Sequence, residues 1–127
     1  MFGNVNNTLT VSWNPSAITG INNNLIRAFE QSVESMKTDV IQEQVVPFNS
    51  GQLQNDISLN TTKEAQGEIL LTTSINYAAR MYFHPEFNFQ TVNNQNARGL
   101  WYEMWIRGSK KYFLQDSFKR FYQGGTP

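Results

Sequence analysis

The strongest constraint on the fold is a stripe of apolar residues that recur at the spacing of an α-helix. Its members lie three or four residues apart: Ile18, Ile21, Leu25, Phe29, Val33, Met36 and Val40. These intervals place the side chains on one face, so the stripe predicts an amphipathic helix of about six turns or more. The helix should end before Pro47, because the residue that precedes a proline avoids helical backbone angles.

A turn is expected directly after this helix, at residues 47–51. Pro47 restricts φ, Ser50 can hydrogen-bond to the local backbone, and Gly51 can adopt a positive φ. The chain therefore reverses here, and Leu53 opens the next predicted element.

Two β-strands are predicted after the turn. They are Leu53–Asn60 and Gly67–Ile75, and the second reads as a central strand because it is rich in Ile, Leu and Thr. Residues 60–66 between them form a loop of the hairpin type. Near the N-terminus, apolar and polar residues alternate over residues 8–13, which predicts a short strand or an extended arm. We expect residues 1–15 to be a polar arm.

The second half of the chain contains a long loop and a second helix. Residues 77–83 are ambiguous between a helical turn and a third strand. Residues 84–99 form a loop of about 15 residues, which is long for a small domain and typical of segments that carry function. Residues 109–122 read as a second amphipathic helix, and residues 124–127 as a flexible tail. The expected core residues of this helix are Phe113, Ser117, Phe118 and Phe121.

Length and composition fit one domain, expected at residues 16–123. The chain has 127 residues, of which 39% are hydrophobic, and this is enough to bury a core. The formal net charge is zero, which argues against a free nucleic-acid-binding protein. The absence of cysteine excludes disulfides and thiolate metal sites. No signal peptide and no long apolar run is present, so we expect synthesis in the cytoplasm and no membrane partner.

His84 is the only histidine, so a Ser-His-Asp type of catalysis would have to use it. No nucleophile elbow and no phosphate-binding glycine motif accompanies it. His84 and Glu86 form the H-x-E pair of zinc deaminases, but those enzymes also need cysteine ligands. We therefore expect no catalytic residue, no metal site and no cofactor, and interpret His84 as ordering its own turn through Pro85.

Basic residues gather near the C-terminus, and the single acidic residue among them in the sequence is Asp116. They are Arg107, Lys110, Lys111, Lys119 and Arg120. Aromatic residues alternate with them, as in surfaces that bind nucleic acid. Two interpretations stay open, namely a solvated helix face or a surface that lines a channel for DNA.

Large aromatic side chains are numerous for a chain this short. They include Tyr82, Phe83, Phe87, Phe89, Trp101, Tyr102 and Trp105. Aromatic clusters are most often part of a core, yet Tyr and Trp are also favoured in contacts between subunits. Some of these rings are therefore candidates for such contacts.

Several segments, taken in order, resemble proteins of tailed bacteriophages. Residues 46–53 resemble the V-P-x-x-T/S-G-x-L segment that follows the first helix in tail-completion and neck proteins, and residues 77–80 resemble their Y-A-x-x segment. Residues 82–90, 96–101 and 108–111 are similar to stretches in the minor capsid protein group of phages that infect Gram-positive bacteria.

This resemblance implies an α+β domain in which a long N-terminal amphipathic helix packs on a small antiparallel sheet, with a second helix near the C-terminus. It also implies a role without catalysis, in the virion at the junction of head and tail. Copies of the chain would form a ring with a lumen for DNA, between a head-completion or adaptor protein and a tail-tube or terminator protein. The exact layer and the choice between six-fold and twelve-fold symmetry stay open.

Long loops and polar termini can reach neighbouring subunits and order on assembly, which indicates the candidate contacts. The loop at residues 84–99 is the first choice, and deleting residues 91–97 should then spare folding and abolish assembly. The arm at residues 1–15 is the second, as an added strand in a neighbouring sheet. Candidate interface residues are Tyr82, His84, Phe87, Phe89, Asn94 and Trp101. The alternative function is a small nucleic-acid-binding or capsid-decorating protein.

Overall fold

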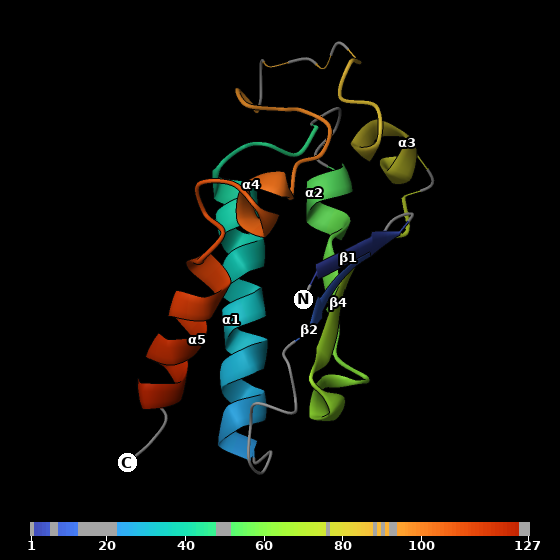
Figure 1. Cartoon of the computed structure of the whole chain (residues 1–127). Coiled ribbons are helices and arrows are strands. Elements are labelled where there is room, and N and C mark those ends of the chain that lie inside the picture. The colour runs from blue at the N-terminus through green and yellow to red at the C-terminus, as the bar shows by residue number, and fades with distance from the viewer. Residues whose placement is uncertain are drawn as a thin grey trace.

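The computed structural model describes residues 2–5, 8–12, 23–47, 52–75, 77–87, 89, 91 and 94–124. It combines helices with a small antiparallel sheet, so the predicted α+β class is confirmed. Figure 1 shows the sheet, the long helix α1 and the C-terminal helix α5 as successive layers, with α1 in the middle. No helix in the described part of the chain is long and apolar enough to span a membrane.

Helix α1 spans Asn23–Gln42 and buries the face that the apolar stripe predicts. Five stripe residues are buried: Leu25, Phe29, Val33, Met36 and Val40. Ala28 and Ser32 join them on that face, and the Ser32 hydroxyl donates a hydrogen bond to the Phe29 carbonyl at 2.7 Å. The long helix is thus partly confirmed: it ends before Pro47, whereas Ile18 and Ile21 lie outside the described residues.

The sheet has the strand order β1-β2-β4-β3, and neighbouring strands are antiparallel. Strand β4 (Glu68–Thr72) is central, as predicted. Strands β1 (Phe2–Val5) and β2 (Thr8–Ser12) form a hairpin at its side, and the Leu9 and Val11 side chains are fully buried. Of the two alternatives predicted for residues 8–13, a short strand or an extended arm, the strand is confirmed for Thr8–Ser12, because burial of Leu9 and Val11 holds β2 in the chain's own sheet.

The predicted strand at residues 53–60 is wrong in its first half. Helix α2 (Gln52–Asp56) comes first, and strand β3 (Ser58–Asn60) follows. A strand would place Asn55 on the same face as Leu53 and Ile57, so its amide would need a buried partner. The helical turn buries Leu53 and Ile57 while Asn55 stays exposed.

The turn between β3 and β4 is a hairpin connection, as predicted, and contains the short helix η2 (Glu64–Gln66). The end of α2 is tied to the end of β4 by Asp56. Its carboxylate accepts hydrogen bonds at 2.6 Å from the Thr73 hydroxyl and from the Ser74 amide. These hydrogen bonds, with that from Thr73 the largest, lower the pKa of Asp56.

Three further helices complete the fold. Helix α3 spans Ala78–Tyr82, which decides the ambiguity at residues 77–83, and helix α4 spans Glu103–Ile106. Helix α5 (Phe113–Gly124) packs along α1. It begins four residues later than the expected start at residue 109, because residues 107–112 form turns closed by hydrogen bonds such as Lys110 N–H to Met104 O at 3.0 Å.

The buried side of α5 differs in one residue from the expectation. Ser117 is buried, and Phe113, Phe118 and Phe121 are partly buried, as predicted. Leu114 is also buried, one residue after the helix begins. Residues 125–127 of the predicted tail lie outside the described residues, and Gly124 is the last residue of α5.

Candidate functional site

The loop expected to contact another subunit is held against the segment that follows α1 in its own chain. The Asn94 side chain is buried, and its Nδ2 atom donates to the Val46 carbonyl at 2.7 Å and to Gln54 Oε1 at 2.9 Å. Asn94 therefore links the loop to the segments on both sides of the predicted turn. It is an internal hydrogen-bonding residue, which corrects its assignment to a subunit interface.

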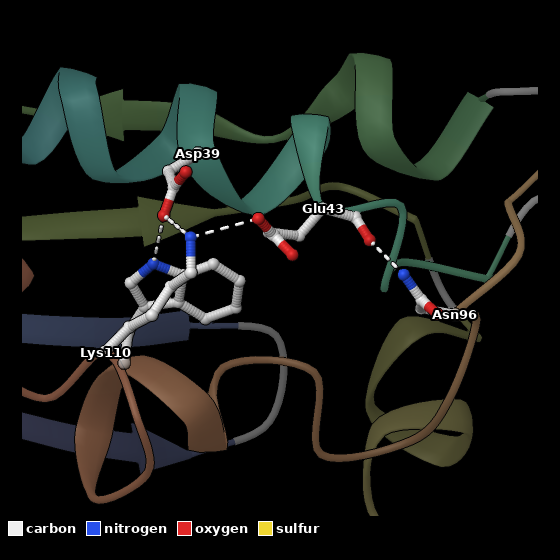
Figure 2. Close-up of polar contacts among 5 residues, drawn as sticks. Asp39, Glu43, Asn96 and Lys110 are labelled. Carbon is white, nitrogen blue, oxygen red and sulfur yellow. Dashed lines mark hydrogen bonds and ion pairs between the residues drawn. The ribbon is translucent and has the colours of Figure 1, made fainter.

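The backbone of residues 94–99, here called the strap, continues this attachment. Asn96 N–H donates to Gln44 O at 3.1 Å, and Arg98 N–H donates to Val45 O at 3.0 Å. The Asn96 side chain adds a hydrogen bond to the Glu43 carbonyl at 2.9 Å (Figure 2). Deleting residues 91–97 would remove the bonds of Asn96, so we expect this deletion to destabilise the fold rather than to spare it.

Gly99 ends the strap at a point where only glycine fits. A Cβ atom there would lie 2.8 Å from Pro85 Cα and 2.9 Å from Met81 O, and both are backbone atoms. The next residue, Leu100, donates its N–H to Tyr82 O at 2.8 Å. The strap thus runs tightly between the C-terminal end of α1 and helix α3.

Gly99→Ala should lower the free energy of unfolding by about 1–3 kcal/mol, since the methyl group forces backbone atoms apart. Urea denaturation followed by circular dichroism measures this loss. Ala97→Ser adds one atom to a half-buried side chain two residues earlier in the same strap and is the control. Equal stability of wild type and Gly99→Ala would contradict the close approach.

Tyr82 and Trp101 belong to an internal aromatic cluster. Their rings meet edge to face, with centroids 4.7 Å apart, and the Tyr82 and Tyr102 centroids are 5.9 Å apart. All three residues are buried, and burial raises the pKa of Tyr102. Tyr82 and Trp101 are therefore core residues, which corrects their assignment to a subunit interface.

His84 lies in an exposed turn closed by the hydrogen bond from Phe87 N–H to His84 O at 3.0 Å. Its Nδ1 atom is 2.8 Å from Glu86 Oε2, and its ring stacks on Phe87 at a centroid distance of 4.7 Å. The hydrogen bond to His84 lowers the pKa of Glu86. The contacts described for His84 supply no nucleophile, and they fit a histidine that orders its own turn.

The remaining candidates in this loop stay near the surface. The Arg80 guanidinium lies 5.6 Å from the centroid of the Phe87 ring. The ring centroids of Phe87 and Phe89 are 6.3 Å apart. Phe87 and Phe89 are half-buried. Within the described ranges, no group of three or more His, Asp or Glu side chains is arranged to hold a metal ion.

Lys110 is engaged inside the protein, so it does not belong to a free basic surface. Its Nζ atom lies 2.8 Å from Asp39 Oδ2 and 3.0 Å from Glu43 Oε1, and Trp105 Nε1 donates to the same Asp39 oxygen at 2.9 Å (Figure 2). Burial alone would lower the pKa of Lys110, but the bonds to Asp39 and Glu43 outweigh it and the pKa is raised. This correction removes Lys110 from the proposed DNA-facing set.

The other basic candidates are exposed. Arg107 pairs with Glu103 at 2.7 Å, one helical turn away. Lys111 lies 5.2 Å from the centroid of Tyr112, and Arg120 lies 5.0 Å from that of Phe121. Lys119 is exposed on α5. With Arg107 and Lys110 engaged by acidic partners, Lys111, Lys119 and Arg120 are the basic residues left for a solvated or DNA-facing surface.

Helix α3 presents an exposed aromatic and basic surface that the sequence analysis did not locate. Ala78 and Tyr82 are buried, so the opposite side of the helix faces outward. We call this surface the α3 face; it consists of Tyr77, Arg80, Phe83 and His84. Tyr77 is 40% exposed and Phe83 is 47% exposed. Helical spacing would have found the α3 face if residues 77–83 had been assigned to a helix.

Of the predicted turn motif, Pro47 and Leu53 are buried, while Ser50 and Gly51 lie outside the described residues. Comparisons of the chain with models of protein families, with curated proteins and with solved structures find no match.

Proposed function

We propose that the protein is a structural subunit of the head-to-tail connection of a tailed bacteriophage, and that it acts by ring assembly and not by catalysis. One observation carries this proposal beyond the resemblance itself. The quoted segments at residues 46–53, 82–90 and 96–101 lie close together at the end of the fold where α1 terminates (Figure 1), joined directly or through residues that flank them.

These contacts are specific. Val46 accepts a hydrogen bond from Asn94, and Tyr82 accepts one from Leu100. Lys110 reaches back to Glu43, four residues before Pro47. Residues in or next to the quoted motifs therefore help to build one part of the fold, which supports a structural role for these motifs.

The packing of α1 supports the finer form of the proposed fold. The buried face of α1 shares a core with Leu9 of β2 and Ile69 of β4. Helix α5 packs against α1 on the side away from the sheet (Figure 1). This is the arrangement implied for a connector subunit, with a long helix on a small antiparallel sheet and a second helix near the C-terminus.

Ring formation requires two different surfaces on each subunit that meet by rotation. We assign one of them to the α3 face with its neighbours Phe87 and Phe89, because exposed aromatic and arginine side chains are the residues that most often dominate binding energy. The other surface stays unassigned, and either six or twelve copies would close the ring around DNA. The basic residues proposed to face the lumen of the ring are Lys111, Lys119 and Arg120. A head-completion or adaptor protein would flank the ring on one side, and a tail-tube or terminator protein on the other.

Phe83→Ser should raise the concentration needed for ring assembly about tenfold or more, because it removes a large exposed ring from the proposed contact. Mass photometry across a concentration series of the purified chain measures the assembled fraction. Tyr112→Ser removes an exposed ring outside the α3 face, 59% exposed against 47% for Phe83, and is the matched control. Identical assembly curves for the two variants would contradict the assignment of the α3 face.

A further inference from the structure

The sheet ends in two open edges, one at β1 and one at β3. The strand order places β1 (Phe2–Val5) and β3 (Ser58–Asn60) on the outside. Among the described residues, the backbone of β1 hydrogen-bonds only to β2, and the backbone of β3 only to β4. The N–H and C=O groups that point outward from both strands can therefore pair with a further strand.

Neither edge carries the residues that usually keep an edge strand from pairing with another chain. Charged side chains, prolines and bulges are the common safeguards. The sequences of β1 and β3 contain no charged residue and no proline, and both strands pair residue for residue with their neighbours, without a bulge. Because both strands are short, one pairing supplies few hydrogen bonds. A closed set of pairings, in which each copy is held on both sides, is then favoured over a single pair of copies.

The registers of the sheet align its two edges. Residues 3–5 of β1 and residues 58–60 of β3 lie in the same three rows across the sheet. One of these rows consists, in order, of Val5, Thr8, Thr72 and Ser58. Because the sheet has four strands and each is antiparallel to its neighbour, β1 and β3 run in opposite directions. A second copy in the same orientation therefore presents its β1 antiparallel to β3 of the first copy.

We propose that β3 of one copy pairs with β1 of the next copy, so that the antiparallel sheet continues from subunit to subunit. In this pairing, Ser58 lies opposite Val5 of the next copy, and Asn60 lies opposite Gly3. The two edges are unlike surfaces, as a ring requires, whereas β1 paired with a second β1 would stop at two copies. This inference rests on the ring assembly proposed above, and it adds a backbone contact to the side-chain contact assigned to the α3 face.

Disulfide cross-linking tests the pairing directly, because the chain contains no cysteine of its own. In the double variant Val5→Cys/Ser58→Cys, the two cysteines of one copy are separated by three strand spacings, about 14 Å. A disulfide needs Cα atoms within about 7 Å, so it can join these positions only between copies. Ser58 is exposed, and its replacement leaves the core intact.

We expect mild oxidation of the assembled double variant to give a ladder of covalent species larger than dimers on a non-reducing gel. Val5→Cys/Asn60→Cys is the matched control, because Asn60 lies two rows away from Ser58 and meets Val5 only diagonally. The in-register pair should cross-link at least about tenfold faster than this control. Gly3→Cys/Asn60→Cys, a second in-register pair, should behave like the first.

The outcomes separate this inference from the proposed function, provided that mass photometry records the assembly of the unmodified chain in parallel. Equal cross-linking rates for the in-register and diagonal variants, in a chain that assembles, would overturn the edge pairing and leave the ring assembly standing. Rapid dimers from Val5→Cys alone would overturn it too, since they would show β1 paired with itself. A chain that stays monomeric at every concentration would contradict both the edge pairing and the ring assembly.

Discussion

Phe29→Ala should lower the free energy of unfolding by about 3–5 kcal/mol, because it removes a large ring from the buried face of α1. Phe29 is buried at the middle of the α1 face that contacts the sheet and α5. Truncation leaves a cavity where a ring was packed, and the layers on either side cannot close it without moving. Urea denaturation followed by tryptophan fluorescence measures the change in midpoint.

Gln31→Ala is the matched control for Phe29→Ala. Gln31 is exposed two residues later on the same helix, and its truncation should change stability by less than about 0.5 kcal/mol. A midpoint for Phe29→Ala equal to that of Gln31→Ala would contradict the placement of the buried face.

Asp39→Ala is expected to cost about 2–3 kcal/mol, because two donors lose their shared acceptor. The buried Trp105 indole N–H and the Lys110 ammonium group both bind Asp39 Oδ2. The Asp39 side chain is only 16% exposed, so water does not fully replace the carboxylate. Thermal unfolding and urea denaturation together give the loss, and Asp39→Asn should recover part of it by keeping one acceptor.

Glu34→Ala provides the comparison for Asp39→Ala on the same helix. Glu34 pairs with Lys37 at 3.9 Å, and its side chain is 57% exposed, so this pair should contribute less than about 0.5 kcal/mol. Equal effects of the two substitutions would mean that the Asp39 cluster is a surface ion pair and not an internal anchor of α4 and α5.

The elements that could be predicted are those whose side chains repeat regularly. The spacing of Leu25, Phe29 and Val33 locates the buried face of α1, and the β-branched and leucine-rich run at residues 67–75 locates the central strand β4. In both elements, the local pattern and the final packing agree, so local reasoning is sufficient.

The elements that could not be predicted depend on contacts between distant parts of the chain. Helix α2 replaces half of an expected strand because Asn55 would otherwise be buried, and Asp56 is held by Thr73 and Ser74 seventeen and eighteen residues later. Residues 8–12 could form either a strand or an arm, and only their pairing with β4 decides for strand β2. A single stretch of residues does not reveal these partners.

The same limit applies to the candidate site. Lys110 belongs to a basic stretch in the sequence, but its acidic partners Asp39 and Glu43 lie about seventy residues earlier. Trp101 and Tyr82 are aromatic residues of a kind found at interfaces, and only the packing of α3 against residues 100–102 places them in the core. The same packing of α3 leaves its opposite side exposed, and this side is the α3 face proposed as a subunit contact.

The measurement that tests the central claim most directly is negative-stain electron microscopy of phage particles labelled with an antibody against this protein. The connector proposal predicts label at the junction of head and tail, and averaging of the labelled region would then distinguish six-fold from twelve-fold symmetry. Label spread over the capsid, or absent from the particles, would contradict the proposal and favour a capsid-decorating or free nucleic-acid-binding protein.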